Sequence, residues 1–135
     1  MWLFPFIPKQ YFGYLDKDQF LVKRFIMSDI QQLIAQIRAF RDARDWEQFH
    51  NSKDLAVALS IEASELLELF LWKGNEDANP DKLKNELADV LMYALLLVDK
   101  HGLDVKEIVE DKMKLNNEKY PVEKAKGTAK KYNEL

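Results

Sequence analysis

The chain has 135 residues, of which 47% are hydrophobic and 32% charged, and it contains no cysteine. This length and apolar fraction describe one globular domain and exclude intrinsic disorder. Disulfides, thiolate metal sites and cysteine nucleophiles are excluded as well. The longest apolar run, from Leu87 to Val98, is interrupted by Asp89 and is too short to span a membrane. The net charge is −3 without a long basic stripe, so we expect neither a membrane nor a nucleic acid as partner.

Residues 1–26 form an aromatic-rich leader that differs from the rest of the chain. The leader holds 8 of the 16 aromatic residues and a net charge of +2, whereas the following 109 residues carry −5. Its apolar stretch precedes the first positive charge and contains Pro5 and Pro8, unlike a secretory signal, and we expect a cytoplasmic protein. Met27 is a usable alternative initiator. The leader is therefore either an extension from the cloning or gene context or a segment that packs across a partner subunit.

Four helices are predicted after the leader, within a catalytic domain at residues 27–121. The capping and stop signals place them from Ser28 through the charged segment ending at Asp45, from about Asp54 to Trp72, from Pro80 to His101, and after Asp104 up to Pro121. No strand pattern occurs. Because the connections are short, we expect an all-α, four-helix bundle with antiparallel neighbours. The lysine-rich tail at residues 122–135 is expected to be a loose or docked extension.

The second and third predicted helices carry acids at positions that the hydrophobic period assigns to the core. Glu62 falls on an apolar stripe that otherwise reads Leu55, Leu59, Leu66 and Leu69. Glu65 follows three residues later, and Glu86 with Asp89 repeats this spacing on the third helix. In an antiparallel hairpin the two pairs should converge. Four carboxylates in an apolar setting need a compensating charge, for which a divalent cation is the favoured explanation.

The type of ligand atom indicates which metal ion these acids would bind. Carboxylate oxygens without a thiolate favour Mg²⁺, or Mn²⁺, over zinc or copper. Because Mg²⁺ commonly bridges carboxylates and phosphate oxygens, the expected substrate is a phosphate compound. The alternative is that these acids form a solvated helix face. A di-iron carboxylate bundle needs two E-x-x-H pairs, and only Glu47-x-x-His50 fits.

The E-x-x-E motif (Glu62, Glu65), followed after 20 residues by E-x-x-D (Glu86, Asp89), resembles that of the MazG-like nucleoside triphosphate pyrophosphohydrolases of the all-α NTP pyrophosphatase superfamily. The chain is similar to the small dCTP-pyrophosphatase-like members. The resemblance covers about residues 30–121 and extends to the segments Arg41-x-x-Arg44-x-Trp46-x-x-Phe49-His50, Lys53-Asp54-Leu55, Leu71-Trp72 and Asn116-x-x-Lys119-Tyr120-Pro121. It implies Mg²⁺-dependent hydrolysis of a (deoxy)nucleoside triphosphate, dCTP-like substrates favoured, to the monophosphate and pyrophosphate, as a house-cleaning or pool-balancing activity.

The resemblance also implies roles for individual residues. The four acids would hold Mg²⁺, and Glu65, or Glu62, would orient or deprotonate the attacking water. The expected substrate-binding residues are Lys53, Lys112, Asn116 and Lys119 for the phosphates, Trp46, His50 and Trp72 for the base, and Tyr93 for the sugar or the metal site. Each of these eight residues could instead have no role in substrate binding and be a surface residue or pack in the core or at an interface.

The helices have broader apolar faces than one four-helix layer needs, which predicts oligomerisation. The family forms dimers or dimers of dimers with the pocket completed by a neighbour, and we expect a homotetramer, with a dimer as the fallback. Two rival functions stay open. One is a non-enzymatic helical interaction protein whose acids bind a basic partner. The other is a hydrolase of the same fold that acts on another phosphate compound, such as phosphoribosyl-ATP or dUTP.

Overall fold

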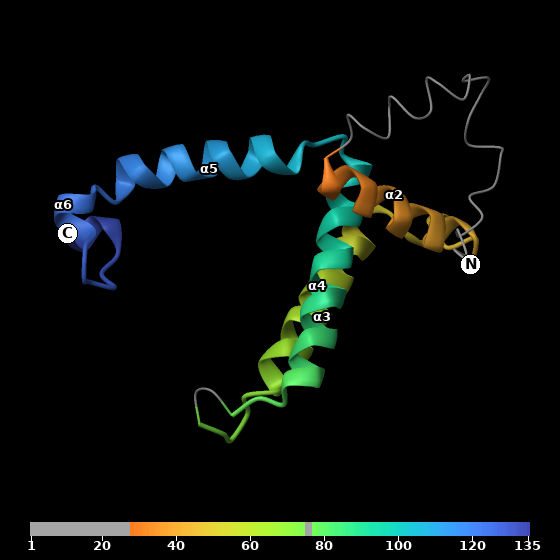
Figure 1. Cartoon of the computed structure of the whole chain (residues 1–135), viewed down its shortest axis with the longest axis horizontal. Coiled ribbons are helices and arrows are strands. Elements are labelled where there is room, and N and C mark those ends of the chain that lie inside the picture. The colour runs from red at the N-terminus through yellow and green to blue at the C-terminus, as the bar shows by residue number, and fades with distance from the viewer. Residues whose placement is uncertain (1–27, 75–76) are drawn as a thin grey trace, which may run out of the picture.

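The computed structural model describes residues 28–74 and 77–135, and the aromatic leader lies outside these ranges. Regular structure in them is entirely helical, which confirms the all-α class (Figure 1). The elements are α2 (Asp29–Asp42), η2 (Glu47–Phe49), α3 (Ser52–Glu68), α4 (Pro80–Lys100), α5 (Val105–Lys119), α6 (Val122–Ala125) and η3 (Tyr132–Glu134). None of these helices combines the length and the apolarity that crossing a membrane requires.

The central unit is an antiparallel hairpin of α3 and α4, which pack along their length (Figure 1). Both helices of the hairpin begin at an asparagine N-cap. The Asn51 side chain accepts a hydrogen bond from the Asp54 N–H, and the Asn79 side chain accepts from the two backbone N–H groups that follow Pro80. Leu55 of α3 and Leu96 of α4 are 1% and 5% exposed, so they form the core of this unit. The hairpin predicted from the short linker is therefore confirmed.

Helix α2 begins at the predicted capping box of Ser28 and Gln31 and packs against α4. Its Ile37 joins the core. Arg38 forms a two-pronged ion pair with Asp99 of α4: Nε donates to Oδ2 at 3.0 Å, and Nη2 bonds to Oδ1. This hydrogen bonding raises the pKa of Arg38 further above its ordinary value. The pair fixes α2 at the end of the hairpin where α4 finishes.

Helix α5 does not run back along the hairpin but extends away from it, with α6 and the C-terminus at its far end (Figure 1). The chain leaves α4 through Gly102, whose φ of +60° is left-handed. A short connection limits the distance to the next helix but leaves its direction open. Within one chain, the fourth helix is thus not the antiparallel neighbour that the connection length suggested. Its apolar residues Ile108, Val109, Met113 and Leu115 are exposed.

Two helices end earlier in the sequence than predicted. The first helix stops at Asp42, because Asp45 adopts a left-handed φ of 54°. The second ends at Glu68, one turn before Trp72, and the next residues make tighter turns in which the Phe70 N–H bonds to the Leu67 carbonyl at 3.1 Å. Trp72 then has a φ of 61°. The apolar residues 69–72 continue the pattern of α3, so hydrophobic periodicity could not reveal the change in backbone geometry there.

Candidate metal and nucleotide site

The facing sides of α3 and α4 bring three of the predicted acids together. Carboxylate oxygens of Glu62, Glu65 and Glu86 all lie within 4.8 Å of one another. Glu62 and Glu86 are half-buried and Glu65 is exposed. Among the described residues, no lysine or arginine forms an ion pair with any of the four predicted acids. The cluster therefore has the donors, the spacing and the unbalanced negative charge that a hard divalent cation fits.

Glu62 is the electrostatic centre of this cluster. Burial raises its pKa above the ordinary value, and the charges of Glu65, Asp89 and Glu86 raise it further. A raised pKa means that the environment penalises the ionised carboxylate. Glu62 is half-buried and lies outside the buried core of Ile37, Leu55 and Leu96. The raised pKa shows that Asp89 lies close enough to interact with Glu62, although Asp89 is not one of the three acids in close oxygen contact.

We expect Glu62→Gln to stabilise the metal-free protein at neutral pH. Because the folded-state pKa of Glu62 is raised, the folded protein holds this proton more tightly than the unfolded chain does. The resulting penalty is absent below the unfolded-state pKa, grows as the pH rises through the folded-state pKa, and persists at neutral pH. The gain should be at most about 1 kcal/mol, since the site is open to solvent. Thermal unfolding in a metal chelator, at neutral pH and near pH ~4, measures it.

The matched control is Glu68→Gln, on the same helix but outside the close acid cluster. This control should leave stability nearly unchanged. Adding Mg²⁺ should stabilise the wild type more than Glu62→Gln, because only the wild type keeps all ligands. Equal pH profiles for the wild type and Glu62→Gln in chelator would contradict the proposed charge crowding.

Tyr93 and His50 extend the site from the acids toward the turn before α3. Tyr93 is half-buried on α4, and its pKa is raised by burial and then by the charges of Glu62 and Asp89. The His50 ring meets the Tyr93 ring edge-on, with 6.3 Å between centroids. His50 Nδ1 is buried and has no hydrogen-bond partner within residues 28–74 and 77–135. Burial lowers the His50 pKa, as do the charges of Arg41 and Lys100, which favours the neutral form of this imidazole.

The turn between α2 and α3 carries Trp46 beside His50. The nearly buried Arg41 fixes this turn through Asp42, at 2.6 Å, and Glu47, at 3.6 Å. The Trp46 N–H bonds to the Arg41 carbonyl at 3.2 Å, and its ring meets Phe40 edge-on. The Trp46 side chain is 44% exposed. A flat ring on an anchored turn, partly open to solvent, suits stacking against a planar ligand.

Other predicted substrate residues lie apart from the acids within this chain. Lys53 is exposed at the start of α3, where it pairs with Asp54 at 3.5 Å. Trp72 is 94% exposed beyond the end of α3. Lys112, Asn116 and Lys119 are exposed on α5, the helix that extends away from the hairpin (Figure 1). Within a single chain, Glu62, Glu65 and Glu86 lie close together and Tyr93 contacts His50, whereas Trp72 and the four predicted phosphate-binding residues lie elsewhere.

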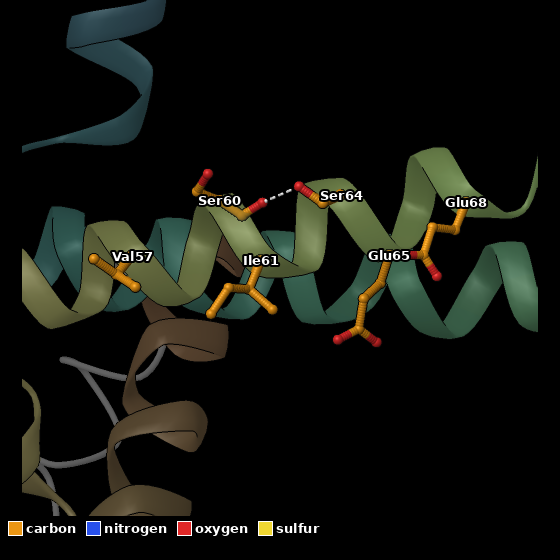
Figure 2. Close-up of a pocket in the computed structure, with 6 residues that line it drawn as sticks. All are labelled: Val57, Ser60, Ile61, Ser64, Glu65 and Glu68. Atoms are coloured by element: carbon orange, nitrogen blue, oxygen red, sulfur yellow. Dashed lines mark hydrogen bonds between the residues drawn. The ribbon is translucent and has the colours of Figure 1, made fainter.

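An open hollow lies on the outer face of α3, next to the acid cluster. Figure 2 shows its lining, with Val57, Ile61, Glu65 and Glu68 along the helix and Ser64 donating to the Ser60 carbonyl at 2.8 Å. Val57 and Ile61 are each 51% exposed. Glu65 thus borders both the cluster and an exposed apolar surface. This surface was not predicted, because hydrophobic periodicity marks only the stripe of α3 that faces the core.

Comparison with known proteins identifies the family of this chain. Residues 57–135 match the model of the MazG-like family. The chain is 38% identical to dCTP pyrophosphatase 1 of Mus musculus and of Homo sapiens over 117 residues, which is 81% of this chain and 67% of each relative. A crystal structure of a pyrophosphatase from Archaeoglobus fulgidus superposes with a TM-score of 0.66 at 38% identity, covering 70% of this chain and 94% of the other. The chain belongs to the MazG-like family.

Proposed function

We propose that this protein hydrolyses deoxynucleoside triphosphates, with dCTP-like substrates preferred, to the monophosphate and pyrophosphate. The observation that carries the proposal is the meeting of Glu62, Glu65 and Glu86 on paired helices without a basic partner in the described residues. The relatives named dCTP pyrophosphatase 1 and the Archaeoglobus pyrophosphatase support the reaction and the base. Balancing the nucleotide pool or removing unwanted nucleotides is the corresponding cellular role, in the cytoplasm.

The proposed cofactor is Mg²⁺, with Mn²⁺ as a substitute, held by Glu62, Glu65, Glu86 and Asp89. When bound, the ion neutralises charge on the triphosphate, which is the main requirement of phosphoryl transfer. Glu65 is the exposed member of the close cluster, so water can reach its carboxylate. We assign to Glu65 the orientation or deprotonation of that water, with Glu62 as the neighbouring acid. The bond that breaks joins the α- and β-phosphates.

The base is proposed to stack on Trp46, with His50 beside it and Trp72 at the rim. The buried His50 Nδ1, which has no hydrogen-bond partner among the described residues, can form a hydrogen bond with a polar base edge. Tyr93 meets the His50 ring and is influenced by the charges of Glu62 and Asp89, so we propose that it contacts the sugar. In this proposal the base lies at the aromatic turn and the phosphates at the acids, the order in which a nucleotide presents base, sugar and phosphates.

We expect Trp46→Ala to raise the KM for dCTP about 5- to 150-fold, because stacking on an aromatic ring contributes about 1–3 kcal/mol per base. The kcat should change much less, since Trp46 does not contact the reacting phosphates in this proposal. Trp46→Phe keeps a stacking surface and serves as the matched control. Steady-state kinetics with dCTP measure KM and kcat for both variants. Equal losses in kcat for Trp46→Ala and Trp46→Phe would contradict the base-platform role.

A substrate panel tests the proposed function. Purified protein with Mg²⁺ is offered each dNTP and NTP, then dUTP and phosphoribosyl-ATP, and pyrophosphate release is followed. The proposal predicts the highest kcat/KM for dCTP or a modified cytosine analogue. Preference for phosphoribosyl-ATP or dUTP would select the alternative substrate within the same fold. Failure to hydrolyse any compound, with stability retained in Glu62→Gln and Asp89→Asn, would favour a non-enzymatic interaction protein.

We further propose that the working form is a homotetramer, with a dimer as its smallest competent unit. In the described residues only Ile37, Leu55 and Leu96 are buried hydrophobic residues, whereas α3 and α5 expose broad apolar faces. Such surfaces are typical of subunit interfaces. Because α5 extends away from its own hairpin, its Lys112, Asn116 and Lys119 are proposed to reach the triphosphate bound to the acids of another copy.

A further inference from the structure

The C-terminal tail folds back on the end of α5. The Tyr120 N–H closes the helix on the Asn116 carbonyl at 2.8 Å, and α6 follows directly after Pro121. Gly127 has a left-handed φ of +77°, which allows the chain to reverse there. The final turn η3 is held by the Glu134 N–H, which bonds to the Lys131 carbonyl at 2.9 Å. The chain leaves α5 at Tyr120, and this path brings Tyr132, twelve residues later, back to the same end of the helix.

Tyr132 contacts the last residues of α5 in two ways. Its ring meets Tyr120 edge-on, at 86° and 6.2 Å between centroids. The Lys119 Nζ lies 5.3 Å from the centre of the same Tyr132 ring, within the range of a cation–π interaction. Among the described residues Lys119 forms no ion pair. The ring therefore restrains the ammonium group without neutralising its charge.

This contact matters because a lysine side chain has many rotamers, and binding a phosphate with it requires most of them to be given up. An aromatic face restricts the ammonium on one side and leaves its N–H donors free on the others. We propose that Tyr132 is a positioning residue that holds Lys119 ready for the triphosphate, so that the tail helps to set substrate affinity. The inference rests on the proposed function, in which Lys119 binds phosphate.

Tyr132→Ala should raise the KM for dCTP about two- to fivefold, the range that corresponds to an exposed cation–π interaction, and leave kcat unchanged. Tyr132→Phe keeps the aromatic face and should behave as the wild type. Lys124→Ala removes an exposed tail lysine with no role in the proposal and is the charge control. In a Lys119→Ala background, Tyr132→Ala should have no further effect, because the two residues act through one interaction.

A second readout is independent of activity. With isotope-labelled dimethyl-lysine, the Lys119 NMR signal should show a ring-current shift that is lost in Tyr132→Ala and kept in Tyr132→Phe. An unchanged KM in Tyr132→Ala, or losses that add to those of Lys119→Ala, would overturn this inference alone. Absent turnover by the wild type would overturn the proposed function as well. Sedimentation of each variant verifies that the assembly is intact.

Discussion

Glu65→Gln is expected to reduce kcat with dCTP by at least about a thousandfold, and Glu62→Gln, Glu86→Gln and Asp89→Asn to weaken metal-dependent turnover strongly. A metal held on transferring phosphates contributes several kcal/mol to the transition state, and about 4 kcal/mol corresponds to a thousandfold. Glu65→Gln also removes the group assigned to the water. Each substitution keeps the side-chain shape and deletes one negative charge. Pyrophosphate release at saturating Mg²⁺ and dCTP gives the effect directly.

Direct metal binding separates this chemistry from a folding defect. Calorimetric titration with Mn²⁺ should show weaker binding by Glu62→Gln than by the wild type, and circular dichroism should show that its helices are kept. Glu68→Gln, three residues beyond Glu65 and outside the close cluster, should keep both metal affinity and turnover. If Glu68→Gln were as damaging as Glu65→Gln, the acids would not form a localised site.

Replacing both Lys112 and Lys119 by alanine is expected to reduce kcat/KM by about 150- to 25,000-fold. Each hydrogen bond between charged partners contributes about 1.5–3 kcal/mol, and two such contacts to the triphosphate would be lost. Both side chains are exposed on α5, so stability should change little. Lys114→Ala is the matched control, because Lys114 lies on the same helix and pairs with Asp111 at 2.8 Å.

Because α5 extends away from its own hairpin, we also expect these lysines to act at the site of another copy. If α5 of one copy reaches the acids of another, mixing the Lys112→Ala/Lys119→Ala protein with Glu62→Gln should restore part of the activity after subunit exchange. Each variant alone should stay inactive. Light scattering should give the mass of a tetramer for both. A monomeric wild type with full turnover, or no recovery in mixtures proven to contain mixed oligomers, would contradict a site shared between copies.

Local signals in the sequence predicted much of the fold, because capping and periodicity are short-range. Ser28 with Gln31 and Asn79 with Pro80 start helices where expected. The convergence of Glu62, Glu65 and Glu86 followed from two i,i+3 pairs on a hairpin, a geometry that the short linker nearly determines.

The direction of α5 could not be predicted in this way, since it follows the left-handed backbone at Gly102 rather than the length of the connection. The contact between Tyr132 and Lys119 depends on a chain reversal at Gly127, and no spacing rule connects residues so placed. The left-handed backbone at Trp72 was equally hidden, because its side chain continued the helical pattern. Short-range patterns thus predict that acids meet on a hairpin, but not where a distant helix or tail lies.

The most direct test of the central claim is the product balance of dCTP hydrolysis by the wild-type protein with Mg²⁺. The arrangement of acids and aromatic turn predicts that dCMP and pyrophosphate accumulate in equal amounts, that neither appears in chelator, and that Glu65→Gln forms almost none of them. Release of orthophosphate with dCDP, or turnover that persists in chelator, would contradict the account.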